Sequence, residues 1–454
     1  QDLGSAAQTR TRGGQTCAAT KMSVLSGRGA GASAKEVKGA ASLLSLVGGV
    51  FIWGAVPVTL IVFTGPKMAA EPGGLSMEEI SSGQSMYWIG WALASVVFMP
   101  KLDRFGRHAP AYIFLVGGIV AAFASTCITT AWSYALCLFC MGVCLPTSSM
   151  LTYLLLTESV PAWFKPMVGT SLNAGFSLCE ALIAVFCANP ATHQMDWRTE
   201  TRLWYSPYVL FLVIGIFYVR DAPKQVEDHL EAAVVEARAE AGISRVLKPG
   251  MRITTVATCL CWSAASVSYY GLNYAAGSLS PNVYVNMLLL GLIDMMGYIL
   301  ALGIIEPFGP RRAQIGSFFI ASVALFVCGA LPSGWMLMAC ALVGRFFVNV
   351  AFATCYLLLV TCFPVESRGS ASGLANFFAR LSSLVAPFCN LLPTGICCTC
   401  LGLLVLAAAG ATTALSELDT VGSEEDKLAE PWLRADCGAV EPNTLKDKDL
   451  QSFL

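Results

Sequence analysis

Four charged side chains lie within stretches of the sequence that are otherwise apolar. A charge at the centre of a lipid bilayer costs at least about 2.5–3.5 kcal/mol, so such residues normally face a cavity or a partner and mark a pathway. No nucleophile–base or metal-ligand constellation accompanies them, and the three histidines fall in predicted loops or the linker, so we expect no enzymatic activity and no cofactor. The four residues, which indicate ion recognition, are Glu180, Asp294, Arg345 and Arg380.

Arg380 is the most informative of the four. It lies midway along an apolar segment, in "NFFARLSSLVAPF". A guanidinium offers a fixed positive fork that matches a carboxylate or a sulfonate, and it repels a bare cation. Arg380 therefore favours recognition of an organic anion; the alternative is a structural ion pair inside the helix bundle.

The other three charges leave more than one role open. Arg345 and Asp294 can neutralise each other as a pair; alternatively, Arg345 is a second anion contact or Asp294 is a protonatable coupling site. Glu180 has no evident partner in the sequence. It could carry a proton and take part in proton coupling, or pair with Arg380 across a cavity.

Aromatic residues near these charges could supply the apolar part of a cavity. Trp262 and Tyr269 recur at helical spacing, Tyr270 is adjacent, and Tyr356 lies in another span. Organic ions pack flat rings against such side chains while a few polar groups fix their orientation. The alternative is a belt of aromatics at the membrane interface, which we favour only for Tyr274, near the end of its span.

All these residues need a membrane-spanning scaffold. Apolar residues make up 56% of the 454 residues and charged residues only 13%, against roughly a quarter charged in ordinary globular proteins. A helix needs about 20 apolar residues to cross the hydrocarbon core. In lipid such runs are helical, because without water the backbone N–H and C=O groups must form hydrogen bonds with one another. We expect an all-α membrane protein with twelve transmembrane helices, near 41–64, 84–100, 109–130, 133–156, 167–188, 204–219, 253–273, 283–305, 313–331, 335–360, 370–391 and 394–416.

The distribution of basic residues predicts the orientation. Of 28 Lys and Arg residues, 13 fall in the loops after spans 2, 4, 6, 8 and 10, and only Lys67, Arg198 and Arg202 fall in the opposite loops. By the positive-inside bias, both termini are then cytoplasmic, and we expect the plasma membrane. Residues 1–40 form an N-terminal tail, and the acidic tail at 417–454 is solvated and could serve regulation or a partner.

Two loop motifs recur at a single offset. "LDRFGRHA" (102–109) is echoed by "IEPFGPRRA" (305–313), and "ESVPAWFK" (158–165) by "TCFPVESR" (361–368), each 203 residues later. Such parallel repeats are typical of transporters in which a substrate site lies between two bundles near the membrane midplane. None of the four intramembrane charges recurs at this offset, which favours a role in function over a role in the scaffold.

The repeat predicts two pseudo-symmetric six-helix bundles. The first bundle covers residues 41–219 and the second covers 253–416, with a cytoplasmic linker at 220–252. The linker is either a helix lying on the bundle or a plain spacer. Most of the 18 cysteines fall within apolar spans, where free Cys behaves as a small hydrophobe; "ICCTC" (396–400) lacks the partner ligands of a metal site.

The loop motifs resemble those of the major facilitator superfamily, over about residues 41–416. Within that superfamily, "SYYGLNYAAGSLSPNVYVNMLLLGLID", "GRFFVNVAFATCYLLL" and "FPVESRGSASGLANFFARLSSLVAPF" resemble the organic cation/anion transporter (solute carrier 22-like) family. The resemblance implies the major facilitator fold and alternating access. In the family, carriers of anions and of carnitine-like zwitterions typically have an arginine at the position that corresponds to Arg380, whereas carriers of organic cations typically have an aspartate. The resemblance therefore implies the anion or zwitterion class for this chain.

The resemblance further implies a cytoplasmic gate. In the superfamily these loop clusters latch the two halves through charge pairs and helix-end contacts, so Asp103 could cap a neighbouring helix and Arg107 could pair with Glu158. A loop that only sets topology is the alternative. The residues expected in the gate are Asp103, Arg104, Gly106, Arg107, Glu158, Lys165, Glu306, Arg311, Arg312 and Arg368.

Several departures from the family pattern predict a divergent member. The loop at 65–83 is short and lacks a glycosylation sequon, Thr361 stands where the family has an acid, and Pro310 replaces a basic residue. Substrate identity therefore does not carry over.

We expect a secondary transporter for a small organic anion or carboxylate-bearing zwitterion, with a lipid bilayer and this substrate as its partners, no nucleic acid, and a monomeric state. No G-x-x-x-x-G-K-[ST] motif is present, so the energy would come from gradients. Alternatives are a sugar or organic cation transporter of the same superfamily, or a transport-dead membrane sensor or scaffold. The expected substrate-binding residues are Arg380, Arg345, Asp294, Tyr270, Tyr356, Tyr269, Trp262 and Glu180.

Overall fold

The computed structural model describes residues 48–98, 107–159, 165–218 and 246–415, and every regular element in these ranges is a helix. Side chains at 158–159, 165–167, 218, 302 and 365–366 are outside the description. The elements of the first half are α3 (Gly49–Ile52), η1 (Trp53–Ala55), α4 (Val56–Thr59), α5 (Ile61–Ala70), α6 (Met77–Val97), α8 (His108–Ser125), α9 (Ala131–Ser159), α10 (Lys165–Ala188), α11 (Pro190–His193) and α12 (Trp197–Tyr218). Those of the second half are α14 (Arg252–Tyr274), α15 (Ala276–Leu279), α16 (Val283–Phe308), α17 (Pro310–Ala330), α18 (Trp335–Cys362), α19 (Val365–Ser382), η3 (Ser383–Asn390) and α20 (Thr394–Thr413).

Each predicted span corresponds to a helix or to a run of consecutive helical pieces. Within the described ranges, eight are long and apolar enough to cross a membrane by length and composition. The helices at the other four predicted spans are also present, as α6, α12, α14 and α19 continued by η3, and they carry more polar residues. Transmembrane helices of this kind line a polar interior, because only a protected face tolerates polar side chains in lipid. The eight are Gly49–Ala70, His108–Ser125, Ala131–Thr157, Val168–Ala188, Val283–Ala301, Pro310–Ala330, Trp335–Cys362 and Thr394–Thr413.

Two helices begin well before their predicted starts. The helix α6 starts at Met77 rather than near residue 84, because Ser76 and Glu79 form a reciprocal capping box that satisfies the first backbone donors. The helix α12 starts at Trp197 rather than near residue 204, and its first turn carries Glu200. The prediction ended these spans at the charged residues, whereas polar first turns extend the helices beyond the apolar core.

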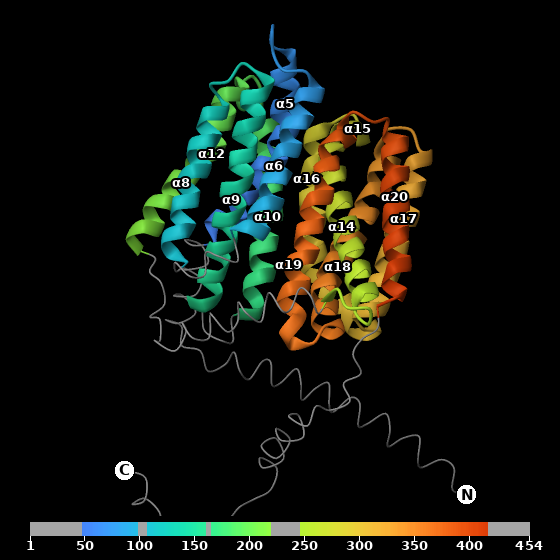
Figure 1. Ribbon diagram of the computed structural model, residues 1–454. Helices are drawn as coiled ribbons and strands as arrows, with labels where there is room; N and C mark the ends of the chain where they lie inside the picture. Colours follow the sequence, from blue (N-terminus) through green and yellow to red (C-terminus); the bar gives the residue numbers. More distant parts are fainter. Residues whose placement is uncertain (1–47, 99–106, 160–164, 219–245, 416–454) are drawn as a thin grey trace, which may run out of the picture. The chain divides into compact units, whose positions relative to one another are not determined.

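Close helix crossings hold each half together. The helix α6 packs along α9, and an added Cβ at Gly142 would collide with the Tyr87 carbonyl, so only glycine permits this approach. Small residues serve the same purpose in many membrane bundles. In the second half, α17 packs against α18 and α20, and α14 packs against α19 and α20. The helices of the two halves gather into neighbouring groups (Figure 1).

Within the described ranges, the most extensive packing between the two halves involves two sets of helices. The helix α10 packs against α16, where a Cβ on Gly291 would lie 2.9 Å from the Ser177 carbonyl oxygen and the Ala181 nitrogen. The helix α6 packs against α19 and η3. These contacts bring side chains from both halves within hydrogen-bonding distance of one another.

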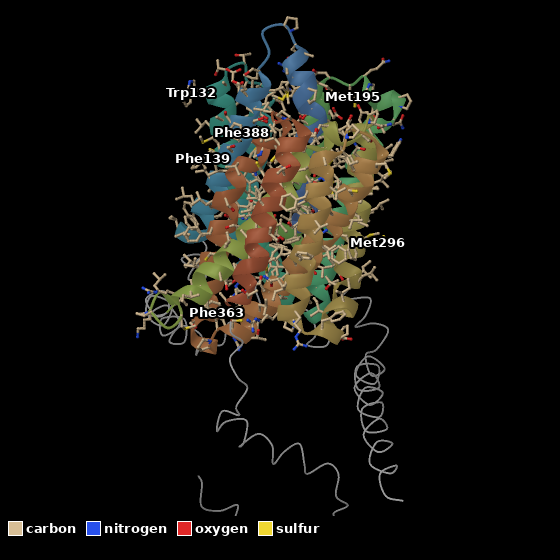
Figure 2. The ribbon with its side chains drawn as sticks, turned by 90° about the vertical axis from the view of Figure 1, so that its right-hand side faces the viewer. Trp132, Phe139, Met195, Met296, Phe363 and Phe388 are labelled. Atoms are coloured by element: carbon tan, nitrogen blue, oxygen red, sulfur yellow. The ribbon has the colours of Figure 1, made fainter. Side chains whose placement is uncertain are left out.

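The protein is apolar on its surface and polar in parts of its interior. Trp132 and Met296 project outward in Figure 2, with 87% and 48% of their surface exposed. In contrast, Glu180, Asp294 and Arg345 are completely buried. This arrangement suits a lipid environment, where charged groups face the bundle interior.

Candidate functional site

Arg345 and Asp294 form a fully buried ion pair, as one of the sequence interpretations predicted. The Arg345 Nε lies 2.7 Å from Asp294 Oδ1, and the Nη2 lies 2.7 Å from Oδ2, so the contact is bidentate. The remaining Nη1 donates to the Tyr269 carbonyl, and the guanidinium carbon lies 3.4 Å from the centre of the Tyr269 ring. Asn349 donates to Asp294 as well. Each guanidinium nitrogen of Arg345 therefore already has a partner within the protein.

Glu180 belongs to the same buried network but contacts only neutral groups. Its Oε1 accepts from the Asn273 amide at 2.9 Å and from the Thr59 hydroxyl at 3.2 Å, and its Oε2 accepts from the Tyr269 hydroxyl at 3.1 Å. Thr59 belongs to the first half, whereas Tyr269 and Asn273 belong to the second. The alternative in which Glu180 pairs with Arg380 is wrong, because the packing of α10 on α16 turns Glu180 toward α14.

Arg380 is buried in a different environment. It is 7% exposed, its guanidinium carbon lies 3.8 Å from the centre of the Trp91 ring, and Nη1 donates to the Tyr270 hydroxyl at 3.4 Å. Its Nε has no hydrogen-bond partner. Within the described ranges, no carboxylate lies within ion-pair distance of Arg380, so the alternative of a structural ion pair finds no support there. A positively charged group with an unfilled donor is thus held on an aromatic face.

Aromatic rings from both halves surround this guanidinium. Trp88 stacks on Trp91 with ring centres 5.4 Å apart, and Trp88 contacts Tyr270 at 4.3 Å. Tyr356 contacts the fully buried Trp262 at 4.5 Å and is itself 47% exposed. The structure therefore places Tyr270 beside Arg380, whereas Tyr269 and Glu180 belong to the network around Arg345.

The sequence interpretation did not select Trp88 and Trp91, although the Arg380 guanidinium lies over the Trp91 ring and Trp88 stacks on Trp91. Both occur in the apolar run "MYWIGWALASVVF", where tryptophans three residues apart share one helix face. That spacing was an available signal. Thr59 and Asn349 were also missed, and nothing in their local sequence distinguishes them from ordinary polar residues.

A partly buried ion pair near the end of α5 was also missed. Lys67 Nζ lies 2.8 Å from Glu200 Oε2, and Glu200 is completely buried. The Cys187 thiol donates to the other carboxylate oxygen at 2.9 Å. The expectation that only four charges lie within the spans is therefore wrong: α5 and α12 extend past their predicted ends, and their charges neutralise each other.

One cavity lies between the halves. It measures about 320 Å³ and is lined by α5 and α6 from the first half and by α14, α15 and η3 from the second. No charged side chain lines it. On α14, its lining residue Tyr274 lies one helical turn from Tyr270, and on α6 Gln84 lies one turn from Trp88. The Tyr274 hydroxyl lies 3.4 Å from the Gln84 amide oxygen.

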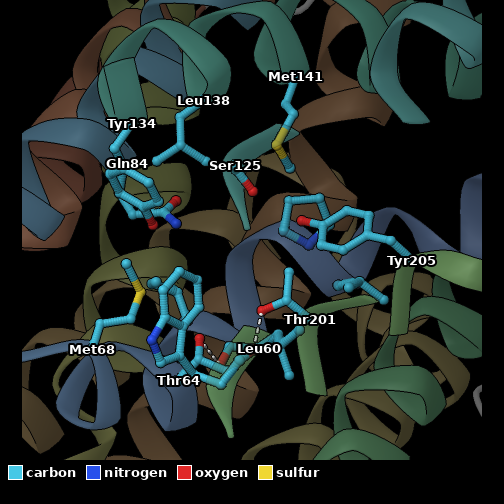
Figure 3. Close-up of a pocket in the computed structure, with 14 residues that line it drawn as sticks. Leu60, Thr64, Met68, Gln84, Ser125, Tyr134, Leu138, Met141, Thr201 and Tyr205 are labelled. Carbon is cyan, nitrogen blue, oxygen red and sulfur yellow. Dashed lines mark hydrogen bonds between the residues drawn. The ribbon is translucent and has the colours of Figure 1, made fainter. Parts of the chain in front are cut away.

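A smaller cavity lies inside the first half (Figure 3). Its volume of about 30 Å³ suits one or two water molecules. The hydrogen bonds drawn there, from Thr64 to the Leu60 carbonyl and from Thr201 to the Trp197 carbonyl, are internal to their helices. None of the predicted substrate-binding residues lines this cavity. It is therefore a packing defect rather than a candidate site.

Comparison with known proteins identifies the family. The family model for the Major Facilitator Superfamily matches residues 39–387. The chain belongs to this superfamily. The xylose transporter XylE of E. coli, in an inward-open conformation, superposes with a TM-score of 0.66 at 17% sequence identity, covering 85% of this chain and 98% of that one. A D-xylose–proton symporter matches with the same TM-score at 18% identity, covering 83% and 98%. At these identities the likeness establishes the fold alone.

Among curated relatives, the facilitator resembles organic-ion transporters. It is 23% identical over 351 residues to an organic cation transporter protein of Drosophila melanogaster, covering 69% of this chain and 63% of that protein. It is 22% identical to solute carrier family 22 member 6 of Danio rerio, covering 68% and 61%. The chain thus spans less than two thirds of the length of these two relatives. Beyond the superfamily, its likeness is therefore to organic cation transporter and solute carrier 22 proteins.

The expected cytoplasmic gate of this facilitator is only partly within the described ranges. Asp103, Arg104 and Gly106 lie outside them, and the side chains of Glu158 and Lys165, at the ends of α9 and α10, are outside the description. The predicted pairing of Arg107 with Glu158 and the predicted capping by Asp103 therefore stay predictions.

The gate residues of the second half make helix-end contacts. Arg311 Nη2 donates to the Thr413 carbonyl at 2.5 Å, and Arg368 Nε donates to the Phe363 carbonyl at 3.0 Å. These carbonyls lie at the ends of α20 and α18, where a cation complements the helix dipole. Glu306 and Arg312 are exposed. A gating role for all of these residues stays a prediction.

Proposed function

We propose that this facilitator carries a small organic anion, or a zwitterion bearing a carboxylate, with Arg380 as the main charge contact. The observation that carries the proposal is the contrast between the two buried arginines. Asp294 neutralises Arg345, whereas Arg380 has no carboxylate partner in the described part of the chain and an unfilled Nε donor.

An anionic substrate removes the energetic cost of burying Arg380 without a partner. A buried charge without a counter-ion costs several kcal/mol, and a bidentate carboxylate is the geometry that a guanidinium fork accepts best. Trp91, Trp88 and Tyr270 supply flat apolar surface for the organic part of the substrate. An organic cation in this place would meet electrostatic repulsion.

Transport would follow from rocking of the two halves around this site. Arg380 and Tyr270 belong to the second half and Trp91 to the first, so the site includes side chains from both moving parts. We propose a plasma-membrane protein with cytoplasmic termini that acts as a monomer. We also propose that three segments are cytoplasmic and flank or join the two transport bundles: the tails at 1–40 and 417–454 and the linker at 220–252.

The test is uptake into proteoliposomes of labelled anions, zwitterions, cations and sugars. We expect uptake of anions or carboxylate zwitterions, and complete loss of that uptake in Arg380→Ala. Arg202→Ala is the matched control, because that arginine lies on the exposed side of α12 and should leave uptake unchanged. Undiminished anion uptake by Arg380→Ala would overturn the proposed contact. Preferred uptake of cations or sugars would favour those alternatives, and no uptake of any class would favour a sensor.

A further inference from the structure

Glu180 forms direct hydrogen bonds between the two halves. It is completely buried on α10 of the first half, and two of its three hydrogen-bond donors, Tyr269 and Asn273, belong to α14 of the second. The third donor, Thr59, comes from α4. A carboxylate in this position acts as a shared acceptor that ties the halves together.

The charges around Glu180 do not balance when it is ionised. The charged groups that act on it are Asp294 of α16 and Arg345 of α18. Arg345 neutralises Asp294 through its bidentate contact, and Tyr269 of α14 is a neutral donor. The pieces α3, η1 and α4 contribute no titratable side chain, and Cys179 is the adjacent thiol on α10 itself. With Glu180 ionised, these side chains carry two negative charges and one positive charge, so one negative charge is uncompensated.

The network also contains an unused acceptor next to Glu180. The Asn273 amide donates its nitrogen to Glu180, while its oxygen, Asn273 Oδ1, is buried without a partner. Rotating the amide by half a turn would present that oxygen to a protonated Glu180, which then donates instead of accepting. The Tyr269 hydroxyl can likewise donate or accept. The same side chains therefore suit both protonation states of the carboxyl group.

We propose that Glu180 is a proton-binding site and that one proton moves with each anion in the same direction. This inference rests on the proposed anion transport. The proton would come from water in the cavity of about 320 Å³, whose lining residues Ile61 and Tyr274 are close neighbours in sequence of Thr59 and Asn273. It binds a carboxylate oxygen without any redox change and leaves to water on the opposite side of the membrane.

Protonation of Glu180 would weaken the connection between the halves, because hydrogen bonds to an ionised carboxylate would be replaced by neutral ones. The ionised carboxylate accepts three hydrogen bonds, two of them across the boundary, and a proton removes part of that accepting capacity. With a monovalent anion at Arg380 and a proton at Glu180, the loaded carrier gains no net charge. Cotransport would therefore be electroneutral and driven by the pH gradient alone.

The experiment compares anion accumulation with and without a pH gradient in proteoliposomes. For the wild-type protein, an exterior that is one pH unit more acidic should sustain up to about tenfold accumulation of a monovalent anion, because one pH unit corresponds to 1.36 kcal/mol. A pH-sensitive dye trapped inside should report proton entry that depends on the anion. In Glu180→Gln, accumulation driven by the gradient and the dye signal should both disappear, while anion-for-anion exchange stays measurable.

Glu78→Gln serves as the matched control, since Glu78 is an exposed carboxylate in the first turn of α6; it should keep the response to the gradient. Wild-type uptake that ignores the gradient, or gradient-driven accumulation that persists in Glu180→Gln, would overturn the proton site while leaving anion transport intact. Loss of exchange as well in Glu180→Gln would also overturn it, by assigning Glu180 to the substrate site. Failure of anion uptake in the wild-type protein would instead remove the proposed function itself.

Discussion

The two intramembrane arginines of the second half, Arg345 and Arg380, have similar burial and different surroundings. Arg345 donates to the Asp294 carboxylate and to the Tyr269 carbonyl, and Asn349 donates to the same carboxylate. Arg380 has a tryptophan face, one tyrosine hydroxyl and an unfilled donor. A guanidinium that is paired with an internal carboxylate stabilises the fold, whereas we propose that the one without such a partner binds a ligand. Burial of a charge in a membrane protein therefore indicates function only after its partners are known.

The largest expected effect on stability comes from breaking the ion pair between Asp294 and Arg345. Asp294→Asn removes the bidentate ion-pair partner of the buried Arg345, which should lower the free energy of unfolding by about 3–5 kcal/mol. The melting temperature of the detergent-purified protein measures this. Glu306→Gln, at an exposed carboxylate of the same helix, should leave the melting temperature unchanged. Replacing both partners by Leu and Met should restore much of the lost stability; an equally unstable double variant would contradict our account.

Arg380→Ala should show the opposite profile, with transport lost and stability kept. Removing a buried cation that lacks a counter-ion eliminates an unfavourable term, so the melting temperature should stay the same or rise. Measured beside Asp294→Asn in one preparation, this variant separates the two arginines directly. A fall in melting temperature as large as that of Asp294→Asn would mean that Arg380 is structural.

Trp91→Ala should weaken anion transport without abolishing it. The guanidinium over the Trp91 face represents a cation–π contact worth about 0.5–2 kcal/mol, so KM for the anion should rise about 2- to 30-fold. Initial uptake rates over a range of substrate concentrations give KM and the maximal rate separately. Trp132→Ala, at a tryptophan that is 87% exposed, should change neither. An unchanged KM in Trp91→Ala would exclude Trp91 from holding Arg380 in place.

The smallest expected effect concerns the surface pair of Arg198 and Glu71, which lie 2.6 Å apart. The hydrogen bond from Arg198 lowers the pKa of Glu71, which follows the end of α5. A lowered pKa contributes stability above the unfolded-state value of about 4.3, and that stability is lost as the pH falls through the folded-state value. Arg198→Ala should therefore cost about 1 kcal/mol or less at neutral pH and less still in acid. A difference in melting temperature that grows on acidification would contradict this.

The spans, their order and the intramembrane charges were predictable from local sequence. Apolar runs such as "IGSFFIASVALFVCGA" can only be helical in lipid, because a helix satisfies all its own backbone hydrogen bonds. The loop motifs that recur at one offset predicted the internal repeat. Helix starts were less predictable: the prediction ended spans at charged residues, but Glu79 caps α6 and Glu200 is neutralised by Lys67. Glu79 forms its contact with Ser76, three positions away, whereas Glu200 forms its contact with Lys67, 133 positions away in the sequence.

By itself, the sequence determined that the chain crosses a membrane many times and that Glu180, Asp294, Arg345 and Arg380 face its interior, because hydropathy and charge are properties of each segment. Only the tertiary structure decided which charges meet. Helix rotation places Asp294 of α16 next to Arg345 of α18, so that the two form an ion pair. It places Glu180 of α10 next to neutral hydrogen-bond donors of α14. The packing of α6 on α19 placed Trp91 under Arg380. Helix rotation depends on contacts summed over whole interfaces, and no single span carries that information.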